Sequence, residues 1–277
     1  MATVTKELAT HYGINIPILT PQTLKAEARA MVQELKPDLL VCFAYGKIFG
    51  PLFMELFPLG GINLHPSLLP KYRGCAPIPA AILNMESCTG VSVQKIAQQM
   101  DSGNILSQIE ISLDGTENAD LLLEKAATIG AKQLVEIVNQ IADSGCVPEG
   151  IVQDHSLATY SSQLCKEDGL LNWQLSAKEL DAKIRAFSSW PGTYTYAKGT
   201  MLKIHQATLC QSSSENSEQN KPGLVIGTDK KIGILVQTGS GIIALQKLQW
   251  QAKKTVTWND FLNGSRDFLG TCLGDNK

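Results

Sequence analysis

The sequence has no long apolar run, and its N-terminus has no apolar segment behind a basic start. A membrane-spanning helix needs about 20 consecutive apolar residues, and a secretory signal needs an apolar core of about 7–15 residues. The 277 residues are 44% hydrophobic and 18% charged, which is typical of a soluble globular protein with a large core. We therefore expect one large or two ordinary domains and no membrane partner.

Regular cysteine or histidine spacing is also missing. The seven cysteines are odd in number and contain no C-x-x-C pair, and the four histidines do not cluster with them. Disulfide frameworks and zinc sites both depend on such spacing. We interpret the cysteines as reduced thiols of a cytoplasmic protein, and we expect no metal.

Acidic and basic residues are spread unevenly along the chain. Residues 1–157 carry 10 basic and 16 acidic side chains, a net charge of −6, whereas residues 158–277 carry 14 and 10, a net charge of +4. The asymmetry suggests that the second half meets an anionic partner. On composition alone, ordinary surface variation explains it equally well.

Apolar periodicity in the first half alternates between helices and strands. Helical spacing covers residues 4–12, 23–35, 51–56, 76–83 and 118–143, the last with an N-cap at Thr116 and an unfavourable Gly130. Strand patterns cover 15–19, 38–44, 60–65, 90–96 and 105–111, and the last two predict a hairpin-like edge. The continuous apolar run 38–44 predicts a strand buried on both faces. Together they predict an α/β, Rossmann-like, mostly parallel sheet.

The second half has a different pattern, which begins after a polar linker at 153–162. A helix is predicted at 177–187, followed by short alternating runs at 193–197, 201–209, 223–228, 233–237 and 241–248. Such strands predict a small β-barrel, with the polar segment 211–221 as a loop. We therefore place the domains at 1–157 and 158–277.

The stretch at 60–74 places Asn63 and His65 at alternate positions of a short strand that Pro66 ends. Period-two geometry puts both side chains on one face, at the carboxyl end where open α/β sheets bind ligands. An imidazole serves as a general acid or base, and an amide donates to an oxyanion. Either residue alone is more often a buried polar group that bonds to neighbouring backbone. The pair, followed by a proline-bounded loop, favours a functional site.

This stretch resembles the signature of the folate-dependent formyltransferases, in which Asn-x-His is followed by Ser-Leu-Leu-Pro. The family's third polar residue is an Asp in the loop after the next strand, where this chain has Asp101. The resemblance implies that Asn63 binds an oxyanion, that His65 transfers a proton and that Asp101 orients His65. On spacing alone, Asp101 is an ordinary turn residue. The resemblance also implies 10-formyltetrahydrofolate as the formyl donor, without a metal, and a folate contact made by Ser67, Leu68, Leu69 and Pro70.

The second half is similar to the C-terminal domain of the methionyl-tRNA formyltransferases. The matching segments are 158–160, 166–169, 172–173, 184–187, 190–192, 202–204 and 260–264. The similarity implies an OB-like barrel that binds initiator methionyl-tRNA, in a cytoplasmic monomer. The candidate phosphate contacts are Lys71, Arg73, Lys166, Lys198, Lys203, Lys253 and Lys254.

Members of this family begin with a further strand, helix and strand that have no counterpart in the sequence. We therefore expect a sheet that is incomplete at its N-terminal side and exposes an apolar edge. A formyltransferase acting on an amino sugar nucleotide or on glycinamide ribonucleotide, and a formyl-folate hydrolase, are alternatives with similar site residues. The formyltransferase that acts on glycinamide ribonucleotide lacks the second domain, which weighs against that alternative. A non-catalytic tRNA-binding remnant is the alternative from another functional class.

Overall fold

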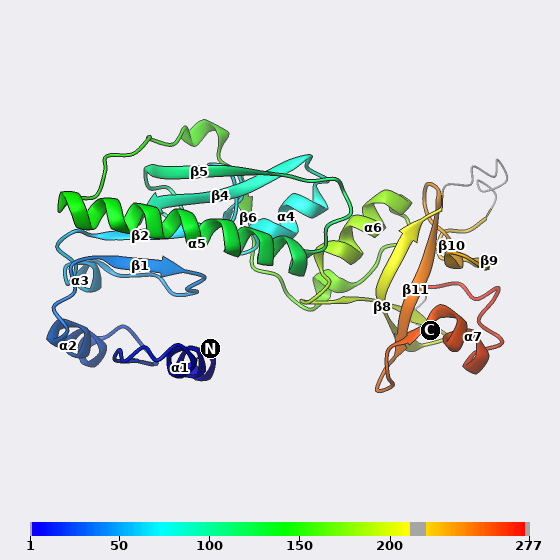
Figure 1. Ribbon diagram of the computed structural model, residues 1–277. Helices are drawn as coiled ribbons and strands as arrows, with labels where there is room; N and C mark the ends of the chain where they lie inside the picture. The colour runs from blue at the N-terminus through cyan, green and yellow to red at the C-terminus, as the bar shows by residue number, and fades with distance from the viewer. Residues whose placement is uncertain (1, 211–219, 275–277) are drawn as a thin grey trace.

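The computed structural model describes residues 2–210 and 220–274, which form two units (Figure 1). Residues 211–219, most of the segment predicted as a loop, lie outside the described residues. The first unit is a sheet with helices, and the second is built mainly from strands. The predicted combination of an α/β unit and a β-rich unit is confirmed.

The first unit contains a four-stranded sheet in the order β1-β2-β4-β5. Its strands are β1 (Leu40–Phe43), β2 (Gly61–His65), β4 (Cys88–Lys95) and β5 (Ile105–Ser112), and its helices are α1 (Ala2–His11), α2 (Ala26–Glu34), α3 (Pro51–Met54), α4 (Pro77–Leu83) and α5 (Ala119–Ser144). β1 and β2 are parallel, whereas β2–β4 and β4–β5 are antiparallel. The predicted β4–β5 hairpin is present, and β4 runs antiparallel to both of its neighbours, so within the described residues the sheet is mixed and not mostly parallel.

The strand prediction for 38–44 was correct in position, but its burial was wrong. Only Cys42 of β1 is buried, while Val41 and Phe43 are 44% and 45% exposed. Among the described strands β1 pairs with β2 alone, so it is an edge strand with an accessible face. This is the exposed apolar edge that the sequence led us to expect. The strand predicted at 15–19 is also wrong, because that segment forms no regular structure.

Helix α5 covers one face of the sheet and runs along β2 and β4 (Figure 1). Its N-cap is Asn118, whose side chain accepts a hydrogen bond from the Leu121 amide, and not the predicted Thr116. Gly130 faces β2 so closely that a β-carbon there would lie 2.6 Å from Leu64 Cδ2. The glycine that interrupts the helical pattern is therefore required by the contact between helix and strand.

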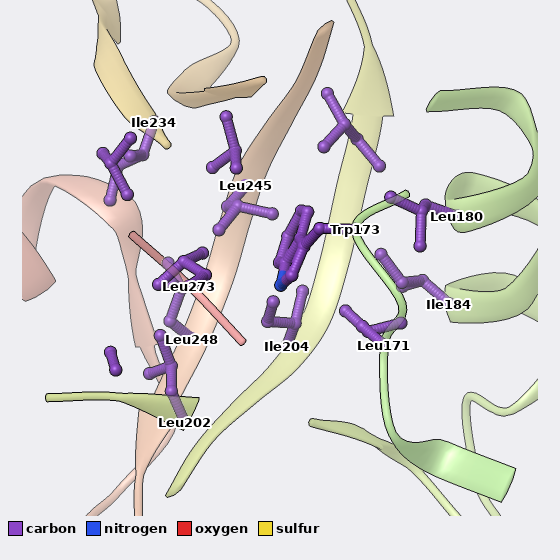
Figure 2. Packing of buried hydrophobic residues seen from close by; sticks show 14 of the residues in the cluster. Leu171, Trp173, Leu180, Ile184, Leu202, Ile204, Ile234, Leu245, Leu248 and Leu273 are labelled. Carbon is purple, nitrogen blue, oxygen red and sulfur yellow. The ribbon is translucent and has the colours of Figure 1, made fainter. Parts of the chain in front are cut away.

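The second unit is a six-stranded antiparallel sheet flanked by helices. Its strands follow the order β7-β8-β11-β10-β9, with β12 against β11, and no described pairing joins β7 to β9. Trp173 lies at the centre of its core, where Figure 2 shows it among leucine and isoleucine side chains. The elements are β7 (Thr193–Ala197), β8 (Thr200–Leu209), β9 (Val225–Asp229), β10 (Gly233–Gln237), β11 (Ile242–Trp250), β12 (Val256–Thr257), α6 (Ala177–Ala186) and α7 (Trp258–Gly264).

The linker between the units returns to the first unit. It contains the 3-10 helices η1 (His155–Leu157) and η2 (Glu167–Gly169), and between them β6 (Tyr160–Ser161). β6 pairs in parallel with β3 (Arg73–Gly74), which follows the loop after β2. Ala186 and Phe187 at the end of α6 also pack into the core of the first unit. The domain boundary between 157 and 158 therefore stays a prediction.

Candidate active site

His65 is the last residue of β2, and its ring is fixed by one hydrogen bond. Its Nε2 atom lies 2.8 Å from the backbone oxygen of Tyr72, and the residue is 4% exposed. A carbonyl oxygen only accepts hydrogen bonds, so Nε2 carries the hydrogen. Nδ1 is then the nitrogen that takes up or releases a proton.

Tyr72, whose carbonyl holds His65, is itself fixed by a carboxylate. Its hydroxyl donates to Glu86 Oε1 at 2.6 Å. Burial, followed by the hydrogen bond to Glu86 and its charge, raises the pKa of Tyr72 to about 12. Tyr72 therefore stays neutral at physiological pH and holds its backbone in place.

Asp101 lies in the loop between β4 and β5 with φ of +51°. Its Oδ1 accepts a hydrogen bond from Gln94 Nε2 at 2.9 Å, and its Oδ2 accepts one from the Gly74 amide at 2.8 Å. Oδ2 also lies 3.6 Å from His65 Nδ1. The structure thus brings together two residues predicted from distant parts of the sequence. A separation of 3.6 Å exceeds a hydrogen bond, as is common in active sites without substrate.

Asn63 shares the face of β2 that carries His65, and its partner across the β2–β4 ladder is Gln94. Its side chain is half-buried, and within the described part of the chain it makes no hydrogen bond. A side-chain amide in such a position retains its donors for a substrate oxygen. All three predicted catalytic residues therefore lie around Gln94, at one end of the sheet.

The loop predicted to contact folate is partly directed inward. Ser67 is fully buried and its Oγ donates to the Lys71 oxygen at 2.6 Å. Leu69 is buried as well, and its amide donates to Ser92 Oγ at 3.2 Å. These two side chains shape the loop. Leu68 and Pro70 are half-buried, and the folate contact predicted for the loop stays a prediction.

Two glutamines that were not predicted as site residues lie beside Asp101. Gln94 and Gln153 are 2% and 3% exposed. Gln94 could have been noticed, because Ser92 and Gln94 alternate with valines just as Asn63 and His65 alternate with apolar residues. No sequence signal marks Gln153, which lies in the polar linker.

Arg73 was one of the candidate phosphate contacts, and its burial contradicts that role. It is 1% exposed, and its Nε and Nη2 atoms donate to Gln153 Oε1 at 3.1 and 2.6 Å. The pairing of β3 with β6 covers it, and a sequence pattern does not show that two strands 87 residues apart meet. No surface role is left for this side chain.

Within residues 2–210 and 220–274, none of the helices has both the length and the apolar composition of a membrane span. In the same part of the chain, no three histidine, cysteine or acidic side chains converge as metal ligands would.

Two family models match the sequence. Residues 2–138 match the model described as "Formyl transferase", and residues 163–266 match "Formyl transferase, C-terminal domain". The two matches lie on the two units of the structure.

Two relatives match most of the chain. A protein of Treponema denticola named methionyl-tRNA formyltransferase is 49% identical over 256 residues, which cover 92% of this chain and 79% of the relative. A protein of Desulforamulus reducens with the same name is 39% identical over 270 residues, which cover 97% of this chain and 83% of the relative.

A solved structure extends the likeness to the fold. WlaRD, a sugar 3N-formyl transferase crystallised with dTDP and 5-N-formyl-THF, aligns with a TM-score of 0.61 at 19% identity, over 90% of this chain and 82% of its own. At that identity the alignment shows a shared fold and nothing further. The sequence identity to the two relatives, together with both family models, shows that the chain belongs to the methionyl-tRNA formyltransferase family.

Proposed function

We propose that the protein transfers a formyl group from 10-formyltetrahydrofolate to the α-amino group of initiator methionyl-tRNA. The observation that carries the proposal is the convergence of Asn63, His65 and Asp101 at one end of the first sheet. These groups supply a donor for an oxyanion, a titratable imidazole and a carboxylate, which acyl transfer to an amine requires.

The first step is attack of the methionyl amine on the formyl carbon. A bond forms between nitrogen and carbon, and the electron pair of the formyl C=O moves to oxygen. The unpaired carboxamide of Asn63 is available to donate a hydrogen bond to that oxygen. Loss of one such donor costs about 10²–10³-fold in rate.

The amine must also lose a proton. His65 accepts it at Nδ1, because Nε2 is bound to the Tyr72 carbonyl. The Asp101 carboxylate, 3.6 Å away, stabilises the resulting imidazolium. When the oxyanion collapses, the bond from carbon to the folate nitrogen breaks and that nitrogen receives the proton from His65. The proton taken from the amine is thus returned to the leaving group.

Basic side chains on the outer face of the second unit support tRNA as the acceptor. Leu202 and Ile204 of β8 point into the core, whereas Lys203 and His205 are exposed. Lys247 of β11 is exposed as well, and so are Lys253 and Lys254 in the turn that follows. Binding of tRNA through such residues weakens steeply with salt. An affinity that does not change with salt would contradict this role.

The proposal also covers the oligomeric state of the protein and its location in the cell. We propose a monomer that acts in the cytoplasm, where translation begins. Light scattering on the purified protein should give the mass of one chain, 30.0 kDa. A dimer mass would contradict the first of these features.

A competition assay tests the proposed function. The protein is given labelled 10-formyltetrahydrofolate together with charged initiator tRNA and an amino sugar nucleotide at equal concentrations. We expect the label on the methionyl amine. Label on the sugar nucleotide would contradict the proposed acceptor, and tRNA binding without folate binding or formyl transfer would indicate a non-catalytic protein.

A further inference from the structure

Arg73 carries a buried positive charge that touches no carboxylate. The four ion pairs among the described residues do not include it. Its hydrogen bonds go to Gln153 Oε1, to His155 Nδ1 at 3.2 Å and, at 3.5 Å, to the Tyr160 hydroxyl. A buried charge is costly unless an opposite charge or a hydrogen-bond network compensates it. Its compensation must therefore come through neighbouring dipoles.

The amide of Gln153 continues this network in a defined direction. Its oxygen accepts from the guanidinium, and the two hydrogens of its Nε2 are shared among three acceptors: the Gly103 oxygen at 2.7 Å, the Asp101 backbone oxygen at 2.9 Å and Gln94 Oε1 at 3.2 Å. A guanidinium only donates and a backbone carbonyl only accepts. The partners therefore leave a single orientation for this amide.

Gln94 repeats the pattern one step further. Its oxygen accepts from Gln153, and its Nε2 donates to Asp101 Oδ1 at 2.9 Å. Every hydrogen bond between Arg73 and Asp101 thus points the same way, from the cation through two amides to the anion. In a buried environment, such a chain of aligned bonds strengthens each of its members.

We propose that Gln153 and Gln94 form a relay of hydrogen bonds from Arg73 that holds the Asp101 carboxylate directed at His65. The two glutamines are positioning residues, since they act through Asp101. The inference deepens the proposed function, on which the catalytic use of Asp101 rests. It also makes the linker between the two units a part of the formyl-transfer site.

Other groups face the carboxylate from each neighbouring element. From β2 comes the His65 imidazole, and from β3 comes the Gly74 amide. From β1 comes the Cys42 thiol; burial, with a smaller effect of the Asp101 charge, raises the pKa of Cys42, so the thiol stays neutral. His155 Nδ1 accepts a hydrogen bond from Arg73, which anchors the start of the relay.

The relay is tested by Gln153→Glu and Gln153→Met. A carboxylate at 153 keeps the contact with Arg73 but neutralises its charge and has no hydrogen to donate to Gln94. Methionine keeps the size and removes both functions. Either change removes the hydrogen bond that holds Gln94, and with it the support of Asp101 Oδ1. The matched control is Gln133→Met, since Gln133 is equally buried but bonds to Ser107 on the helical side of the sheet.

The measurement is kcat for formyl transfer, for each variant alone and in combination with Asp101→Asn. For both Gln153 variants we expect kcat to fall by about tenfold or more with KM for both substrates unchanged, because a misplaced carboxylate no longer supports His65. In the Asp101→Asn background they should cause no further loss, since they act through Asp101. The control should match the unmodified protein. An undiminished loss in that background would indicate a merely structural glutamine and overturn the relay, as would an unchanged kcat.

A second readout does not depend on activity. Carbon-13 NMR of aspartate-labelled protein, with Asp101 assigned by its absence in Asp101→Asn, reports the surroundings of this carboxyl group directly. The relay predicts that the Asp101 carboxyl signal moves in both Gln153 variants and stays in place in Gln133→Met, and an unmoved signal in the Gln153 variants would overturn it. If the unmodified protein forms no product in the assay, the proposed function fails, while the NMR comparison still decides the relay.

Discussion

Alanine in place of Gly130 sets two effects of opposite sign against each other. In a helix interior, alanine is more stabilising than glycine by about 1 kcal/mol. In this structure, however, the new β-carbon would lie 2.6 Å from Leu64 Cδ2 and 2.8 Å from Cδ1. Leu64 is buried between helix and sheet, and overpacking of this kind costs about 1–3 kcal/mol. We therefore expect Gly130→Ala to lower the free energy of unfolding by about 0–2 kcal/mol, despite the better helix former.

The same change should affect formyl transfer, since Leu64 lies between Asn63 and His65 in β2. A strand displaced by α5 moves both site residues, and a shift of about 1 Å can cost about 10²-fold in rate. Urea denaturation followed by circular dichroism measures the stability, and a single-turnover assay measures the rate. Adding Leu64→Val removes the δ-carbons and should recover part of both losses.

Gly264→Ala is the control for this prediction, because the β-carbon that it would add in α7 has no described atom within 4 Å apart from its chain neighbours and the backbone of its own helix. It should be neutral or slightly stabilising. A stabilised Gly130→Ala protein with full activity would refute the argument that close approach of helix and strand requires glycine there.

Three further predictions follow from other contacts. At Gly74, φ is +107° and an added β-carbon would lie 2.4 Å from the Ser161 oxygen. Gly74→Ala should therefore separate β3 from β6 and destabilise the protein by about 2 kcal/mol or more, as expected for a strained backbone position. An unchanged urea midpoint would contradict this. The hydrogen bond from Tyr72 is the largest cause that lowers the pKa of Glu86 below its ordinary 4.5, so this group adds stability above pH 4.5 that is lost as the pH falls through its folded-state pKa. Stability of Tyr72→Phe should therefore depend less on pH in this acid range than that of the unmodified protein, and equal slopes would contradict the role of the hydrogen bond. Trp173→Phe removes the bond from Nε1 to Thr195 Oγ1 at 2.9 Å and should cost about 1–3 kcal/mol without changing kcat; a lower kcat would show that the second unit's core affects the site.

The core of the site could be predicted from the sequence because its signal is local. Asn63 and His65 alternate in one strand, and a proline ends that strand, so their shared face follows from two-residue periodicity. Asp101 needed the family resemblance, since Asp-Ser-Gly on its own is an ordinary turn. Its approach to His65 depends on the β2–β4 pairing, which no local pattern specifies.

What the sequence failed to predict involves contacts between distant segments. A buried Arg73 looks like any surface arginine until β3 is seen to pair with the linker, and Gln153 is recognised only through its partners. The apolar run 38–44 predicts burial on both faces, yet Val41 and Phe43 remain accessible because β1 has one neighbour among the described strands. Periodicity shows which side chains share one face of a helix or strand, but it does not show which other segment of the chain covers that face.

The most direct test of the account is the single-turnover rate of His65→Ala with saturating donor and charged initiator tRNA. Removing a general acid–base group should lower this rate by about 10²–10⁴-fold, while tRNA binding and the urea midpoint change little. Formyl transfer at the rate of the unmodified protein would contradict the claim that the imidazole beside Asp101 carries the proton.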